Sequence, residues 1–217
     1  DLPVPDVERH DPYRASLGDS RKLSDAQIVF YSGLHLEGRM VDVLENLAQQ
    51  LSNPVAALIS VPFQGNLDFG IGPGGGSRFT LNIQPVIPIT LNEDWNLISR
   101  TIVPIISQDD IFPGAGSQFG LGNVTQSLFF SPTKPVNGFV WGVGPVAYVP
   151  TNTNDLLGPD QWGLGPTAVA LWQGNGWTLG MLANHIWSVG PNNGNPDISS
   201  TFLQPFVSYT TKDAWTF

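Results

Sequence analysis

Apolar and polar residues alternate strictly through FTLNIQPVIPITL, residues 79–91. Every odd position of this stretch is apolar, whereas the even positions include Asn82 and Gln84. Because successive side chains of a β-strand point to opposite faces, the pattern predicts one long strand. One face of that strand is apolar, and the other carries amides and hydroxyls.

The same alternation recurs from residue 57 to near the end of the chain and predicts an all-β fold. The expected strands are 57–71, 78–91, 95–106, 118–131, 138–149, 161–172, 176–188 and 201–210, with Trp215 as a candidate start of a ninth. Short turns at 92–94 and 173–176 alternate with longer loops at 107–117, 150–160 and 189–199. This alternation is typical of antiparallel up-and-down outer-membrane β-barrels.

Residues 1–50 have a different pattern. They hold five of the nine basic residues, and MVDVLENLAQQL at 40–51 has apolar residues at helical spacing. A cap-like run, Ser24 to Gln27, precedes a second helical candidate, IVFYSGL. We therefore predict an α-containing segment at 1–50 and a β-barrel domain at 51–217, with the boundary near 48–53.

A soluble β-sandwich would show a similar alternation. Two features favour the barrel: the polar faces carry very few charges, and several strands approach the ~9–11 residues that cross a bilayer. Tryptophans near strand ends suit an interfacial girdle, and the candidates are Trp95, Trp141, Trp162, Trp172, Trp177 and Trp187. Prolines inside predicted strands count against a regular ladder, and these are Pro85, Pro88, Pro104, Pro145, Pro166 and Pro205.

Composition narrows the function classes. Only 12% of the residues are charged, against about a quarter in soluble domains, and the net charge is −9. Lys and Arg do not cluster with aromatics, so no nucleic-acid partner is expected. The absence of cysteine excludes disulfides and thiol chemistry. No transmembrane helix is expected, and a signal peptide is expected to be absent or already removed.

No catalytic constellation is visible in the sequence. His10, His35 and His185 lie in separate predicted elements, and no GxSxG motif is present. The acidic pairs 93–94 and 109–110 are interpreted as solvated turn residues. We therefore expect no enzyme activity, no cofactor and no metal site.

Arg100 is the most informative charge, because it lies in the middle of the predicted strand 95–106. A lipid-facing arginine at the bilayer midplane costs ~2–4 kcal/mol, so we expect its side chain to point into the lumen. There it could form an ion pair or influence the passage of anions, and the pattern leaves both open. The other expected pore-lining residues are Asn82, Gln84 and Gln126.

The stretch DPYRASLGDSRKLSDAQIVFYSGLHLEGRMVDVLE, residues 11–45, resembles part of the solute-binding proteins of zinc and manganese ABC importers. In that family a DPHxY-type motif supplies a metal-ligating histidine. Here no histidine stands between Pro12 and Tyr13, and His35 does not match a ligand position. His10 and Asp11 cannot form a four-ligand site by themselves, so metal binding is not predicted.

Residues 47–217 resemble a family of bacterial outer-membrane transporters related to barrels of the phenol meta-degradation pathway, some labelled neuromedin U. The matching stretches are NPVAALISVPFQGNLDFGIGP, LNIQPVIPITLNEDWNLISRTIVPII, FPGAGSQFGLGNVTQSLFFSP, WGVGPVAYVPT and LQPFVSY. The resemblance implies that the strand prolines are tolerated at bulges or kinks. Family members continue for several strands past the equivalent of Phe217, so we expect an incomplete barrel, truncated at its C-terminal side.

The leading hypothesis is a non-enzymatic barrel in the bacterial outer membrane, a transporter or passive channel for small solutes, whose hydrophobic character stays open. Its expected partners are outer-membrane lipid and a solute that the sequence does not specify, as it does not specify the oligomeric state. One alternative is a soluble, secreted β-sandwich that binds a ligand. Another is a fused or truncated chain without independent function.

Overall fold

The computed structural model describes residues 39–190, 197–212 and 215–217, with side-chain surroundings from Glu45 onward. One helix, α2 (Arg39–Leu51), precedes ten strands. They are β1 (Phe63–Ile71), β2 (Gly76–Ile83), β3 (Val86–Thr90), β4 (Trp95–Asp109), β5 (Ser117–Leu121), β6 (Val124–Pro132), β7 (Phe139–Val149), β8 (Trp162–Gly174), β9 (Trp177–Val189) and β10 (Ser199–Tyr209). The helical candidate at 24–34 lies outside the described residues, as do His10 and His35.

The strands form one antiparallel sheet in the order β1-β2-β4-β6-β7-β8-β9-β10. β3 continues the path of β2 along β4, and β5 precedes β6 on the other side of β4. The break between β2 and β3 falls at Gln84-Pro85, where proline has no N–H to donate to the β-ladder. The sheet therefore contains eight strand paths, which correspond to the eight strands predicted from the alternation.

Two predicted boundaries differ from the structure. Residues 57–62 are not a strand, and only an isolated bridge joins Ser60 to Val86. Near the candidate ninth strand, only a bridge between Thr210 and Thr216 is formed. The division into two regions near residues 48–53 stays a prediction.

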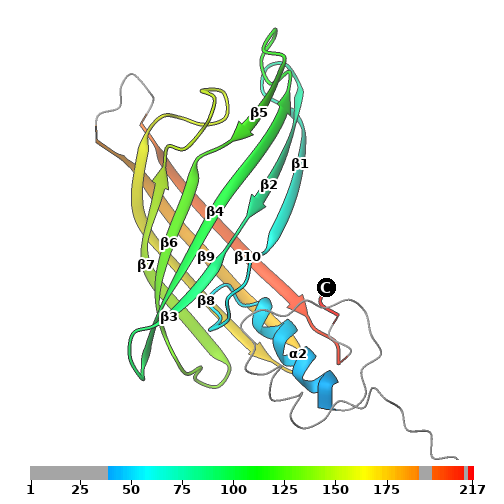
Figure 1. Ribbon diagram of the computed structural model, residues 1–217, viewed down its shortest axis with the longest axis vertical. Coiled ribbons are helices and arrows are strands. Elements are labelled where there is room, and N and C mark those ends of the chain that lie inside the picture. Colours follow the sequence, from blue (N-terminus) through cyan, green and yellow to red (C-terminus); the bar gives the residue numbers. More distant parts are fainter. Residues whose placement is uncertain (1–38, 191–196, 213–214) are drawn as a thin grey trace, which may run out of the picture.

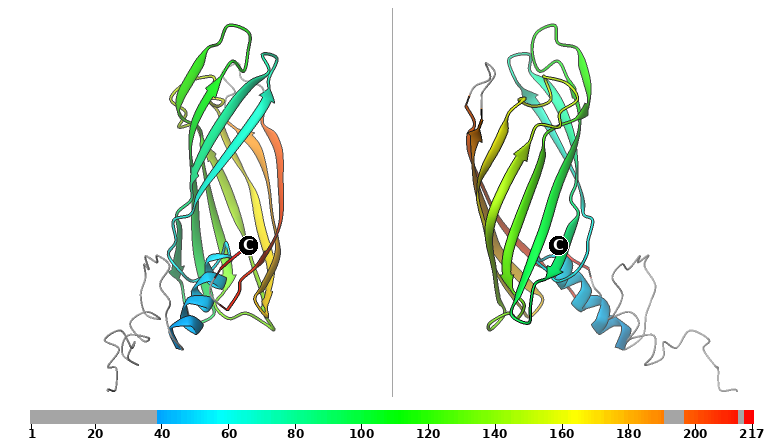
Figure 2. Two further views of the ribbon diagram at one scale, coloured as in Figure 1. Left: turned by 90° about the vertical axis from the view of Figure 1, so that its right-hand side faces the viewer. Right: turned by 60° about the vertical axis from the view of Figure 1, so that its left-hand side comes forward.

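The sheet curls around a long axis into a half-barrel (Figures 1 and 2). The described strands all belong to this one sheet, so the prediction of a barrel-like all-β fold is confirmed over the two-sheet sandwich. β1 and β10 are the ends of the path and are not paired with each other in the described ranges. Helix α2 and the connections at 91–94, 133–138 and 175–176 lie at the lower end in Figure 1, and the connections at 72–75, 110–116 and 150–161 lie at the upper end.

Apolar side chains fill the lower interior of the half-barrel. This basal core contains Val55, Val86, Ile98, Phe129, Val140, Val169, Leu171 and Leu182, with Phe206 packed against it. Val55 comes from the segment after α2, and all other members come from the inner faces of strands. The helix is also tied to the sheet, because Gln173 Nε2 donates a hydrogen bond to the Gln49 carbonyl oxygen at 2.8 Å.

The repeated WGVGP and WGLGP motifs meet in space. Pro145 of β7 and Pro166 of β8 are directly opposite each other in the register. A Cβ built on Gly144 would overlap the carbonyl oxygen of Leu128, and one on Gly165 would overlap that of His185. Glycine permits this close approach of neighbouring backbones, and glycine kinks are a device by which sheets curve.

Candidate solute-binding site

The outer face of the sheet is apolar and exposed. On β8 it presents Trp162, Leu164 and Trp172, and on β9 it presents Trp177, Leu179, Met181 and Trp187. The glycines, threonines and amides of these strands point to the opposite, inner face. An exposed apolar band with a polar interior is the inverse of a water-soluble domain, and it is the distribution that a membrane barrel needs.

The tryptophans predicted as interfacial lie in two rows. Trp95, Trp141, Trp172 and Trp177 lie at the lower ends of their strands, and Trp162 and Trp187 lie at the upper ends. Trp95 and Trp141 contact edge-to-face, with ring centroids 5.8 Å apart. Along β8 and β9 the rows are ten residues apart, which for strands tilted by about 40° is a height of about 25 Å. That height matches the apolar band of outer-membrane barrels.

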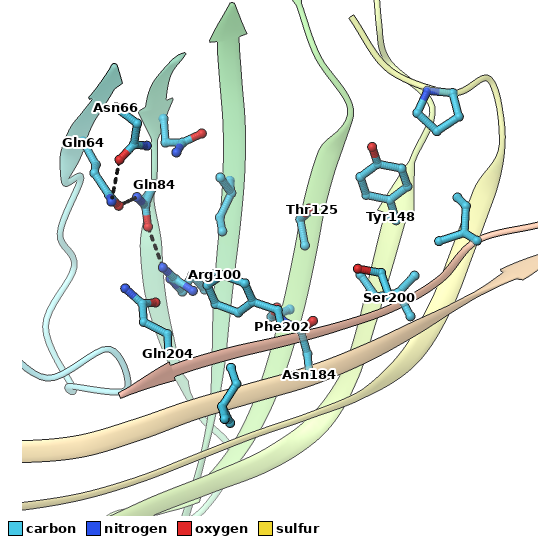
Figure 3. A pocket seen from close by; sticks show the side chains of 17 residues that line it. Gln64, Asn66, Gln84, Arg100, Thr125, Tyr148, Asn184, Ser200, Phe202 and Gln204 are labelled. Carbon is cyan, nitrogen blue, oxygen red and sulfur yellow. Dashed lines mark hydrogen bonds between the residues drawn. The ribbon is translucent and has the colours of Figure 1, made fainter. Parts of the chain in front are cut away.

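The inner face lines a cavity of about 610 Å³ above the basal core. Its polar wall carries amide and hydroxyl side chains from both ends of the sheet: Gln64, Asn66, Asn82, Gln84, Thr125, Ser127, Tyr148, Asn184, Ser200 and Gln204. Its apolar wall includes Ile102, Ile186, Ile198 and Phe202. Figure 3 shows the labelled side chains of β1, β4, β6, β7, β9 and β10 facing this common space.

Arg100 is the one charged side chain among the described residues that line this cavity. Its Nη2 donates a hydrogen bond to Gln84 Oε1 at 2.5 Å, and Gln84 Nε2 donates to Gln64 Oε1 at 2.8 Å. Gln64 Nε2 in turn donates to Asn66 Oδ1 at 3.2 Å (Figure 3). This chain of amides crosses from β4 to β1 and fixes the guanidinium at the cavity wall.

A second, smaller cavity of about 280 Å³ lies between the first cavity and the end of α2. Three residues line both cavities: Gln84, Arg100 and Gln204. Along the inner face of β4, Arg100 follows the buried Ile98 of the basal core and precedes Ile102 of the larger cavity. The guanidinium therefore lies at the boundary between the two spaces.

The loop at 150–161 folds inward over the upper end of the larger cavity. Asn123 Nδ2 donates to the Pro159 carbonyl oxygen at 2.7 Å, and Pro159 lines the cavity. Gln108 Nε2 donates to the Leu156 carbonyl oxygen at 3.0 Å, and Leu157 is buried. The cavity is thus bounded by this loop above and by the basal core below.

Three of the four predicted pore-lining residues, Asn82, Gln84 and Arg100, line the cavity. Gln126 does not, because it pairs with Thr101 while the inward-facing Arg100 pairs with Ser127. This register turns Gln126 to the outer face. There it accepts a hydrogen bond from Thr101 Oγ1 at 2.6 Å and donates to Ser99 Oγ at 3.0 Å. The expectation that Gln126 faces the lumen therefore differs from its place in the fold.

Several cavity residues were not predicted from the sequence. Gln64 and Asn66 alternate with exposed Phe63 and Leu67, so the strand pattern contained a signal for their inward orientation. Gln204 had no such signal, because the inner face of β10 also carries Phe202 and Phe206.

Helix α2, the one helix of the described residues, is not long and apolar enough to cross a membrane. No group of three or more His, Asp or Glu side chains is placed to hold a metal ion within the described ranges.

The curled antiparallel sheet, its exposed apolar face and its polar interior define a barrel-like protein of the outer-membrane type. Residues 56–216 match the family described as "Putative MetA-pathway of phenol degradation", and the chain belongs to that family. The family and the fold together point to an outer-membrane-associated protein.

A different similarity covers a short stretch of the chain. Over 53 residues it is 49% identical to the manganese-binding lipoprotein MntA of Bacillus subtilis (strain 168). The match covers 24% of this chain and 17% of that relative. No solved structure gives a significant match.

Proposed function

We propose that this protein is a non-enzymatic component of the bacterial outer membrane that binds small solutes in its lumen and passes them across the membrane. The observation that carries the proposal is the distribution of side chains over one curled sheet. Exposed apolar side chains and two tryptophan rows about 25 Å apart cover the outside. A cavity of about 610 Å³ lined by amides, hydroxyls and Arg100 occupies the inside.

Membership of the family supports a role near the degradation of small aromatic compounds. The cavity volume falls within the ~300–1,000 Å³ of small-molecule sites. Its walls combine aliphatic and aromatic side chains with a few polar groups, as solute sites do. The inward loop at 150–161 and the basal core lie on the route through the lumen, so passage requires at least one of them to move.

The membrane part of the proposal is tested by expressing the full chain in a bacterium with an outer membrane. We expect the protein in the outer-membrane fraction, extracted only by detergent. Its unheated form should migrate differently from the boiled form in gels, because a folded membrane sheet resists unfolding by detergent. Recovery from the aqueous fraction without detergent would contradict the membrane location.

The passage part is tested on the refolded full chain in lipid vesicles. We expect efflux of entrapped benzoate or benzyl alcohol above that of protein-free vesicles, and a matched boiled sample is the control. Efflux equal to that control would overturn passage and leave the membrane location standing.

A further inference from the structure

The lumen holds a positive charge with no negative partner among the described residues. Neither cavity is lined by a described Asp or Glu, and Arg100 is the one charged residue of both. Its Nη2 is bonded to the neutral side chain of Gln84, and its other N–H groups have no partner in the described ranges. A guanidinium presents five donors in a fixed fork that matches a carboxylate. The sequence left two roles open for Arg100, an ion pair or an influence on the passage of anions. No ion pair of Arg100 with a described residue is formed.

The surroundings of Arg100 suit the rest of an organic anion. Asn82, Asn184 and Gln204 line the larger cavity and form no side-chain hydrogen bond with other described residues, so their amides are available to a polar ligand. On the same cavity, Ile102 and Phe202 present apolar surface. The amide chain through Gln84 holds the guanidinium in place before a ligand binds, which lowers the cost of ordering it.

We propose that the lumen contains a binding site for a small organic carboxylate, with the carboxylate on Arg100 and the hydrocarbon part against Ile102 and Phe202. Because Arg100 lines both cavities, a solute that moves from one cavity to the other must pass its side chain. The site therefore selects small amphipathic monoanions over neutral molecules of the same shape. This inference rests on the proposed function, because it names the class of solute that the lumen binds.

The test is calorimetric titration of benzoate into the refolded full chain in detergent, with benzyl alcohol as the neutral probe of similar size. Charge-assisted hydrogen bonds to a carboxylate are stronger than neutral ones, so we expect benzoate to bind at least about tenfold more tightly than benzyl alcohol. Arg100→Gln should abolish this preference, and Arg100→Lys should retain part of it because it keeps the charge and loses the fork.

Arg78→Gln is the matched control, because it removes the same charge from the neighbouring strand β2 at a residue that lines neither cavity. It should leave benzoate binding unchanged. Heat-modifiable gel mobility identifies the variants that have folded, and if Arg100→Gln fails to fold, the Lys variant and the two probes on the parent chain decide.

Three results would overturn the proposal: equal affinity for benzoate and benzyl alcohol, unchanged benzoate binding in folded Arg100→Gln, or displacement of benzoate by an equal concentration of chloride. The last result would indicate a site for any anion. The titration does not depend on passage. Binding without efflux from vesicles refutes transport alone, and efflux without a preference for benzoate refutes the carboxylate site alone.

Discussion

At the scale of single residues, the direction of each strand side chain decides its environment. Ile87 and Asn82 lie on the same strand path, β2 and β3, yet Ile87 is 44% exposed on the outer face and Asn82 lines the cavity. The polar residue that does face outward, Gln126, has its amide hydrogen-bonded to Ser99 and Thr101. Hydrogen bonding of this kind lowers the cost of placing an amide on an apolar face.

Single-cysteine labelling tests these orientations cleanly, because the chain contains no native cysteine. We expect a fluorophore on Ile87→Cys to be quenched by lipid-chain quenchers in vesicles, and one on Asn82→Cys to escape that quenching. The measurement is the ratio of fluorescence with and without the quencher, and the unsubstituted chain shows the background labelling. Equal quenching at both positions would contradict the assignment of the two faces.

At the scale of elements, two glycine–proline pairs meet across neighbouring strands. Pro145 faces Pro166 across β7 and β8, and Gly144 and Gly165 stand where a neighbouring backbone passes too close for a side chain. Pro166 lies where the ladder is irregular, because the pairing of β8 with β9 is interrupted between Leu164 and Thr167. Pro88, Pro104 and Pro205 instead lie within continuous registers.

Gly165→Ala should destabilise the fold, because its Cβ would overlap the backbone carbonyl of His185. Overpacking of this kind costs about 1–3 kcal/mol, and we expect the urea midpoint of refolded protein in detergent to fall. Gly65→Ala on β1 is the control, since its Cβ would lie 3.3 Å from the exposed side chain of Phe79 instead of overlapping backbone. Equal midpoints for the two variants would refute the close backbone approach at Gly165 as the cause of the loss.

At the scale of the whole molecule, the half-barrel is filled at one end and hollow above it. Val55 is 4% exposed and joins the segment after α2 to side chains from six strands. The basal core therefore couples the N-terminal connection to the sheet, and it bounds the smaller cavity on the side of α2.

Val55→Ala should lower the free energy of unfolding by about 2 kcal/mol, from lost burial and the cavity left behind. The matched control is Val61→Ala, six residues further on, where the side chain is 49% exposed and little loss is expected. Urea unfolding of both variants in detergent gives the comparison. A loss at Val61 as large as that at Val55 would argue against the basal core as the anchor of this segment.

The sequence by itself determined the strand set and the two faces of most strands, because a period of two residues is a local property of the chain. The outward rows of Trp162, Trp172, Trp177 and Trp187 followed directly from that period. The inward position of Asn82 and Gln84 followed from the same period, and that of Arg100 followed from the cost of an arginine in lipid.

Only the tertiary structure decided which residues meet across the lumen. The face of Gln126 depends on the register of β6 against β4, and neighbouring Phe129 and Phe130 make the local pattern ambiguous. The joining of β1 and β10 residues in one cavity, the inward fold of the loop at 150–161 and the insertion of Val55 are contacts between distant segments. Such contacts depend on how the sheet curls, which no local period encodes.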